Sequence, residues 1–335
     1  MIDLRSDTVT LPTQEMKEAM FDAKLGDDVF GEDPSINELE QYSARLFGKE
    51  AALFCPSGTM TNQIALNVHL QPGDEVICHR EAHIYQYEGG GIAKNSGASV
   101  RLIHGNNGML TAQDVLDNIN PDDVHFTRTA LVALENTMNR GGGVCYDFSA
   151  MEAIKKVCLA NNLPLHLDGA RVFNAIVKNN ESTLDYGKTF DSISICLSKG
   201  LGAPVGSVLI GDANFIKQAK RVRKVFGGGM RQAGMLAKAG WYALNHHVER
   251  LRVDHVHAEQ LANSLKKCFW VNNVEAVETN IVVFEVENPA EILVKLKSHG
   301  ILAIGFGGNK LRMVTHLNIS QNDITKACEL IEKMK

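Results

Sequence analysis

Short apolar runs alternate with signals for helix starts over the first 210 residues of this chain. Ser35, Ser149 and Asn288 each precede a glutamate by three positions, which is the spacing of a helix N-cap. Strands that alternate with helices form a mostly parallel sheet covered by helices on both faces. The sequence therefore predicts an α/β fold with a seven-stranded main sheet. We expect its strands at residues 51–55, 75–78, 100–104, 130–134, 163–167, 193–197 and 207–210.

The pattern changes in the last third of the chain, where a long helical stretch is expected from about residue 230 to 267. The segments after it again mix strand and helix patterns, so we expect a second, smaller unit. The sequence predicts a large domain at residues 1–250 and a smaller C-terminal α/β domain at residues 251–335. The smaller domain is expected to contain a strand at 281–286, a helix at 289–299, apolar runs at 301–304 and 311–314, and a last helix from Ser320.

Composition excludes several classes of protein. The net charge is −5 and no block of lysine and arginine appears, so no nucleic-acid partner is expected. No apolar run approaches the ~18 residues of a membrane helix, and residues 1–7 lack the apolar core of a signal peptide. The seven cysteines are scattered and never form a Cys-x-x-Cys pair, which favours reduced thiols in a cytoplasmic protein. No metal-ligand spacing is present, so no metal site is expected.

Lys199 comes directly after the apolar run at 193–197 and is followed by Gly200 and Gly202. Most lysines keep the ammonium in water, so a solvated surface charge is the ordinary interpretation. Here the preceding strand is expected to be buried, and the glycines leave few side chains beside the amine. Burial lowers the pKa of a lysine, and the free amine can then attack a carbonyl to form a Schiff base. This is the chemistry of a lysine that binds pyridoxal phosphate (PLP).

Asp168 lies at the carboxyl end of another apolar strand and is followed by Gly169. Ligands bind at this edge of α/β sheets. An aspartate bonded to the pyridine nitrogen of PLP keeps that nitrogen protonated, so the ring can accept electrons from the substrate. A helix N-cap is an equally good interpretation of Asp168 taken alone. Arg171, three residues further on, could pair with the ring oxygen or with a substrate carboxylate.

The phosphate of such a cofactor needs a helix N-terminus. Residues 51–60 read as strand, turn and helix start, with Gly58 allowing close backbone approach and Ser57 and Thr59 offering hydroxyls. Neither a Walker motif nor Gly-x-Gly-x-x-Gly is present, so ATP and NAD lose their usual support. His83 follows the strand at 75–78 and could stack on the cofactor ring, although a lone histidine is more often structural.

These residues resemble one family, the low-specificity L-threonine aldolases among the fold-type I PLP enzymes. The matching segments occur in the order of the family and cover almost the whole chain, so together they are highly specific. They include the residues around the lysine, the aspartate and the phosphate turn. The segments are 4–10, 27–34, 56–63, 134–137, 166–171, 196–206 and 227–232.

The resemblance implies a role for each residue of a cofactor site. Lys199 would carry the covalent bond to PLP, Asp168 would hold the pyridine nitrogen, and His83 would stack on the ring. Gly58 and Thr59 would bind the phosphate. The fold implied is that of fold-type I PLP enzymes, with a large and a small domain.

The resemblance also implies an assembly and a substrate site. Arg231 would help to bind the phosphate from a neighbouring subunit, in a homotetramer built from dimers that share active sites. Ser6, Arg171 and Arg312 would hold the substrate carboxylate. His125 matches a family histidine near the substrate hydroxyl and would be catalytic together with Lys199 and His83.

The activity implied is cleavage of L-threonine or L-allo-threonine between Cα and Cβ, to glycine and acetaldehyde. Met138 stands where the family usually has histidine, and Phe30 where it often has tyrosine, so both bear on substrate preference. Within PLP enzymes, an aminotransferase or a β-eliminating lyase shares the lysine, aspartate and phosphate sites. A catalytically silent PLP-fold scaffold is disfavoured because Lys199, Asp168 and Arg312 are all retained.

Overall fold

The computed structural model describes residues 1–334 and contains the expected seven-stranded sheet. Its strand order is β2-β8-β7-β6-β5-β3-β4. Only β8 runs antiparallel to its two neighbours, so the prediction of a mostly parallel sheet is confirmed. The strands are β2 (Ala51–Cys55), β3 (Glu75–His79), β4 (Ser99–Ile103), β5 (Thr129–Glu135), β6 (Leu165–Gly169), β7 (Ser192–Cys196) and β8 (Ser207–Gly211).

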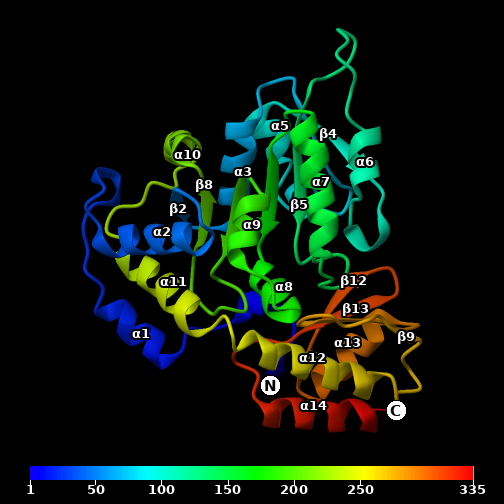
Figure 1. Cartoon of the computed structure of the whole chain (residues 1–335). Coiled ribbons are helices and arrows are strands. Elements are labelled where there is room, and N and C mark those ends of the chain that lie inside the picture. Colours follow the sequence, from blue (N-terminus) through cyan, green and yellow to red (C-terminus); the bar gives the residue numbers. More distant parts are fainter. Residues whose placement is uncertain (335) are drawn as a thin grey trace.

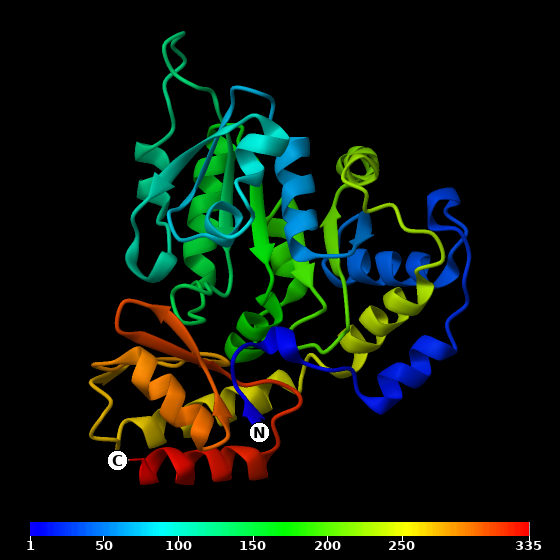
Figure 2. The same cartoon turned by 180° about the vertical axis from the view of Figure 1, so that it is seen from behind.

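Helices lie on both faces of this sheet (Figures 1 and 2), as parallel strands require. Every residue of β3, β5, β6, β7 and β8 is buried, which explains why the sequence shows continuous apolar runs there. The helices of this part are α1 (Gln14–Phe21), α2 (Pro34–Leu46), α3 (Gly58–His69), α4 (His83–Gln86), α5 (Gly91–Ser96), α6 (Ala112–Asp117), α7 (Phe148–Ala160), α8 (Val172–Asn179), α9 (Thr183–Thr189), α10 (Ala213–Val225) and α11 (Gly234–His246), with short 3-10 turns at Asp7–Val9, Asp28–Phe30 and Asn106–Gly108.

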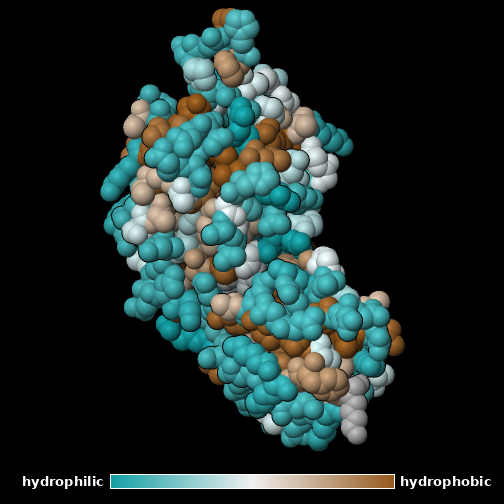
Figure 3. Space-filling view, turned by 90° about the vertical axis from the view of Figure 1, so that its right-hand side faces the viewer, coloured by the Kyte–Doolittle hydropathy of each residue, from teal (hydrophilic) through white to brown (hydrophobic). Residues whose placement is uncertain are grey.

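The C-terminal part builds a second, four-stranded antiparallel sheet in the order β12-β13-β10-β9. An apolar core separate from that of the main sheet lies beneath it, and Ile2 and Leu4 from the start of the chain belong to this core. Strand β1 (Ile2–Asp3) pairs with β11, so the N-terminus joins the smaller lobe. The side view shows the two lobes (Figure 3). The elements are β9 (Asn273–Val274), β10 (Ile281–Glu285), β11 (Ile301–Leu302), β12 (Ile304–Gly307), β13 (Lys310–Val314), α12 (Leu251–Leu265), α13 (Pro289–Ser298) and α14 (Gln321–Lys333).

Some local predictions were wrong. Asp33 and Asp147, not Ser35 and Ser149, cap α2 and α7, because each carboxylate precedes the helix and accepts its first N–H groups. Asn288 does cap α13 as predicted. The helical stretch from 230 to 267 is two helices, α11 and α12, interrupted near His247, whose ring bonds the carbonyl of Leu201.

No helix within residues 1–334 is long and apolar enough to cross a membrane. All seven cysteines are free thiols.

Candidate active site

A cavity of about 350 Å³ opens at the carboxyl ends of β5, β6 and β7. Its walls come from three parts of the chain: the N-terminal segment, the edge of the main sheet, and the β12–β13 hairpin of the small sheet. Sequence-distant segments therefore meet at the place where α/β sheets bind ligands. The lining residues are Ser6, Thr8, His83, Tyr87, Glu135, Asn139, Arg140, Ala170, Arg171, Lys199, Ile304, Gly305, Phe306 and Arg312.

Lys199 reaches this cavity from a tight turn after β7. The N–H of Gly202 donates to the carbonyl of Lys199 at 2.9 Å. Gly202 has a φ of +79°, and a Cβ there would meet Leu317 at 2.8 Å, so only glycine fits this turn well. Lys199 itself is half-buried. The turn thus presents the amine to the cavity from the end of a rigid strand.

Asp168 is the last residue but one of β6, is buried and does not itself line the cavity. One of its carboxylate oxygens lies within 4.8 Å of a ring nitrogen of His83. Asp168 Oδ1 accepts the N–H of Ala170 at 3.1 Å, and its Oδ2 accepts the side-chain amide of Asn62 at 2.8 Å. The same Asn62 amide nitrogen also donates to Glu88 at 2.9 Å. Because two carboxylates accept from this nitrogen, the carbonyl oxygen of Asn62 must point the other way.

A chain of buried polar groups fixes that orientation of Asn62. His166 Nε2 lies 3.2 Å from Asn62 Oδ1 and must donate to it, while His166 Nδ1 lies 2.9 Å from the Ser192 hydroxyl. Burial, and then the charge of His69, lower the pKa of His166 to about 3, so the ring is neutral and its Nδ1 accepts from Ser192. Ser192 Oγ in turn accepts from His69 Nε2 at 2.8 Å. This chain of hydrogen bonds keeps the amide nitrogen of Asn62, and not its oxygen, turned toward Asp168.

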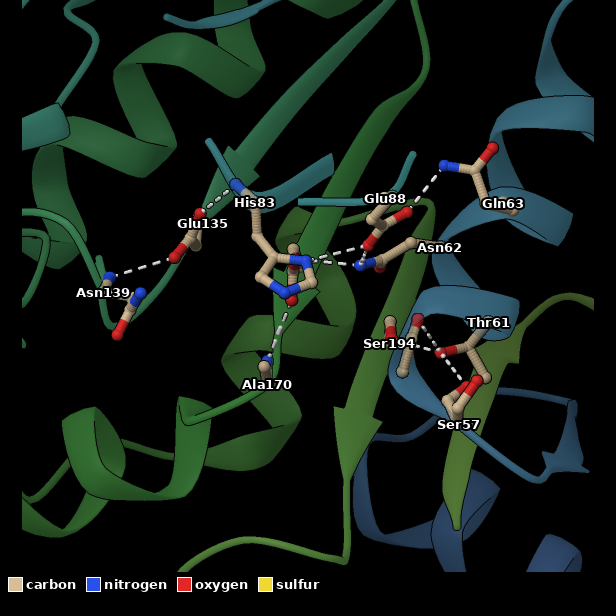
Figure 4. A network of polar contacts seen from close by, with 12 residues as sticks. Ser57, Thr61, Asn62, Gln63, His83, Glu88, Glu135, Asn139, Ala170 and Ser194 are labelled. Carbon is tan, nitrogen blue, oxygen red and sulfur yellow. Dashed lines mark hydrogen bonds and ion pairs between the residues drawn. The ribbon is translucent and has the colours of Figure 1, made fainter. Parts of the chain in front are cut away.

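His83 occupies the start of α4 and lines the cavity. Its Nδ1 donates to Glu88 at 2.9 Å, and its backbone N–H donates to Glu135 at 2.8 Å (Figure 4). Burial alone lowers the pKa of His83, but the bond to Glu88 and the charge of Asp168 outweigh burial and raise it above 6.5. Nε2 is the ring nitrogen not held by Glu88.

Glu135 ends β5 beside Asp168 in the sheet register and lines the cavity. Its two oxygens accept the backbone N–H groups of His83 and Asn139, at 2.8 and 2.9 Å. Burial, and then repulsion by Asp168, raise the pKa of Glu135 to about 7. This carboxyl group therefore anchors the backbone at His83.

Arg171 forms two parallel hydrogen bonds to Asp7, each 2.7 Å long, and both side chains are buried. Burial would raise the pKa of Asp7, but the charge and the hydrogen bonds of Arg171 hold it well below its ordinary value. Asn280 donates to the same carboxylate at 3.3 Å. The pair ties the N-terminal segment to the edge of the main sheet.

Arg312 is buried in the cavity wall without a carboxylate partner among residues 1–334. Its terminal nitrogens donate to Asn139 Oδ1 at 2.9 Å and to the carbonyl of Arg5 at 3.2 Å, while its buried Nε has no partner in the described structure. Burial, and then the charge of Arg171, lower the pKa of Arg312 to about 10. A buried cation in this position is suited to bind an anionic ligand.

The turn before α3 is a candidate anion site, separate from the cavity lining. Ser57 caps α3 by accepting the N–H of Met60, and the first N–H groups of a helix have no partner inside the helix. A Cβ at Gly58 would lie 2.5 Å from the sulfur of Cys196, so the residue there must lack a side chain. Ser57 and Thr59 are exposed.

The structure does not bring every predicted site residue to this cavity. The Arg231 side chain is 54% exposed and pairs with Asp27 at 2.9 Å, outside the cavity lining. The His125 side chain is 84% exposed and bonds Asp123, on the segment between α6 and β5 that projects from the large lobe (Figure 1). Within a single chain, neither residue lines the site. Their roles stay predictions.

These groups fit PLP: an amine for its aldehyde, a fixed carboxylate for its ring nitrogen, an imidazole for its ring face, and a helix start for its phosphate. Two observations support this fit without any appeal to sequence resemblance. The residue at position 58 must lack a side chain, and the Asn62 amide is oriented toward Asp168. The fold and the site define a PLP-dependent enzyme of fold-type I.

Comparison with known proteins also identifies a PLP-dependent enzyme and narrows the class to a lyase. The family model described as beta-eliminating lyase matches residues 3–289. The low specificity L-threonine aldolase of Escherichia coli K12 is 43% identical over 97% of both chains, and low-specificity L-threonine aldolase 1 of Arabidopsis thaliana is 40% identical over 96% of this chain and 93% of its own. This chain belongs to the low-specificity L-threonine aldolase family.

Solved structures agree on the fold. A Leishmania major threonine aldolase superposes with a TM-score of 0.88 at 20% identity, covering 99% of each chain. A putative L-allo-threonine aldolase from Listeria monocytogenes superposes with a TM-score of 0.82 at 24% identity, covering 95% of this chain and 92% of its own.

Sequence patterns did not assign a role to Asp7, Asn62, Glu88 or Arg140. Asp7 and Asn62 fall within the family segments, but no strand-end or motif signal distinguished them. Glu88 and Arg140 reach the site only through the folding of their loops. The contacts that indicate a role for each of these four residues exist only in the folded structure.

Proposed function

We propose that this enzyme cleaves L-threonine and L-allo-threonine, and related 3-hydroxy amino acids, between Cα and Cβ to give glycine and an aldehyde. The observation that carries the proposal is the 43% identity to low specificity L-threonine aldolase over 97% of both chains. The combination of Lys199 and the carboxylate-free Arg312 in one cavity supports it.

PLP, when bound, supplies an electron sink for the broken bond. In this proposal Lys199 holds the cofactor covalently, and Asp168, oriented by Asn62, stabilises a protonated ring nitrogen. Gly58 and Thr59 bind the phosphate at the start of α3.

The substrate carboxylate binds Arg312, assisted by Ser6 and Arg171. Arg171 already gives two of its five N–H donors to Asp7, so the two on Nη1 and the second on Nη2 are left for a ligand. By fixing the carboxylate, these residues would set which bond of Cα is presented to the cofactor, and so would favour cleavage of Cα–Cβ over loss of the α-proton.

His83 stacks on the ring and accepts the hydroxyl proton at Nε2, because Nδ1 is bound to Glu88. Glu88 stabilises the protonated imidazole that results. A water molecule held by His83 and His125 is the second candidate for this base.

We also propose a cytoplasmic homotetramer, a dimer of dimers with shared active sites, that acts in threonine catabolism and glycine biosynthesis. Arg231 and His125 lie outside the cavity of their own chain, so each would serve the site of another subunit. Residues 1–250 would form the PLP-binding domain and residues 251–335 the small domain.

Product analysis tests this function. The purified protein is incubated with PLP and L-threonine or L-allo-threonine, and the products are separated. Equimolar glycine and acetaldehyde are expected. Release of ammonia or of a keto acid instead would identify a β-eliminating lyase or an aminotransferase. The Lys199→Ala variant should lose turnover of both substrates.

A further inference from the structure

Arg140 is a second cation of the cavity wall that the proposed reaction does not use. It lies on the loop after β5, and its guanidinium carbon sits 4.2 Å from the centroid of the Phe306 ring. One terminal nitrogen donates to the carbonyl of Phe306 at 2.8 Å. Phe306 belongs to β12 of the small sheet, so the contact holds Arg140 at the mouth between the lobes.

No carboxylate among residues 1–334 pairs with Arg140. Three other cations of the cavity already have a role: Arg171 is bound to Asp7, and in the proposed function Lys199 holds the cofactor and Arg312 binds the substrate carboxylate. A guanidinium stays charged at physiological pH. The Arg140 guanidinium therefore contacts one carbonyl and one ring face, and its charge faces the cavity without a carboxylate partner among the described residues.

Arg312 lies near the same aromatic ring, 5.2 Å from its centroid. The two guanidinium groups thus form a pair of anion-binding points within the reach of one short molecule. The one cavity-lining acid, Glu135, directs its oxygens to the backbone N–H groups of His83 and Asn139 instead.

An amino-acid substrate with an uncharged side chain has one carboxylate, which the proposed function assigns to Arg312. We propose that Arg140 binds a second carboxylate, so the favoured substrates are 3-hydroxy amino acids whose β-substituent ends in a carboxylate. This inference rests on the proposed function. The simplest such substrate is 3-hydroxyaspartate. Its Cα–Cβ bond breaks, the hydroxyl loses its proton, Cα gains one, and the products are glycine and glyoxylate; no oxidant or reductant is needed.

The experiment compares kcat/KM for L-threo-3-hydroxyaspartate and for L-threonine in three proteins: the native enzyme, Arg140→Gln and Arg140→Lys. Loss of a charge-assisted contact to one substrate should lower the ratio of the two kcat/KM values by about 10- to 100-fold in Arg140→Gln. Arg140→Lys keeps the charge and should restore part of the ratio. The matched control is Arg252→Gln, an exposed arginine on α12 paired with Glu249, which should leave the ratio unchanged.

A second readout does not depend on turnover. Succinate and propionate differ by one carboxylate, so succinate should raise the thermal midpoint of the PLP-loaded native protein more than propionate does. Arg140→Gln should abolish that difference.

Three results would overturn the inference. One is an equal fall of both kcat/KM values in Arg140→Gln, which would make Arg140 a support for the hairpin or for the α-carboxylate. Another is native enzyme that cleaves threonine but not 3-hydroxyaspartate. The third is equal stabilisation by succinate and propionate. If threonine is not cleaved at all, the proposed function fails, and the succinate comparison still decides whether Arg140 binds a second carboxylate.

Discussion

Asp7→Asn should destabilise the protein strongly, because it removes one charge from a buried ion pair. The Asp7 side chain is fully buried and that of Arg171 is 6% exposed, and two hydrogen bonds of 2.7 Å join them. Removing one partner of such a pair leaves an uncompensated buried charge and costs about 3–5 kcal/mol. We therefore expect a loss of this size in the free energy of unfolding, measured by urea denaturation of the cofactor-free protein.

The double variant Asp7→Asn, Arg171→Met is the informative control. It removes both charges, and replacing a whole buried pair by uncharged groups is often nearly neutral. The double variant should thus be more stable than Asp7→Asn alone. A loss below about 1 kcal/mol for the single variant, or a double variant no better than the single one, would refute the assignment of a tightly coupled buried pair.

The same pair predicts a dependence on pH with a definite sign. The pKa of Asp7 is lower in the folded protein than its ordinary value of 3.8. Its contribution to stability is therefore fully present above the unfolded pKa and is lost as pH falls below about 4. The stability difference between the native protein and Asp7→Asn should be constant near neutral pH and shrink in acid. A difference that grows in acid would contradict this reasoning.

Three further predictions test other parts of the site. His166→Leu should raise the dissociation constant for PLP about tenfold, because the buried amide of Asn62 that His166 orients becomes free to turn. His166→Gln keeps a donor and should bind PLP more tightly than the leucine variant. Equal affinities of the two variants would exclude an orienting role for His166. Glu88→Gln should move the acid limb of kcat/KM for threonine to lower pH, because the carboxylate that raises the pKa of His83 is lost. An unmoved limb would remove His83 from the role of base. Gly58→Ala should impair PLP retention through collision with the sulfur of Cys196, and Cys196→Ala should relieve that defect; absence of rescue would show that the collision is not the cause.

The sequence predicted the main sheet well because its strands are buried on both faces and appear as continuous apolar runs. Lys199, Asp168 and His83 could be proposed from the sequence for the same reason, since each follows such a strand or lies at its end. Their meeting in one place is a consequence of parallel topology.

Other features depend on contacts that no local pattern encodes. Asp7 and Arg171 are 164 residues apart and meet only in the folded chain, where the N-terminal strand β1 pairs with β11 of the smaller lobe. Asn62 lies on α3 among buried residues, and nothing local distinguishes it from a core position. The N-caps of α2 and α7 were misplaced because two acceptable capping residues stand within two positions of each other, and the aspartates have the better geometry.

The covalent attachment site of PLP tests the central claim most directly. The PLP-loaded protein is reduced with borohydride and digested, and the peptide carrying the pyridoxyl group is identified by mass spectrometry. We predict a single modified residue, Lys199. A pyridoxyl group on another lysine, or none on any, would contradict the placement of the cofactor in this cavity.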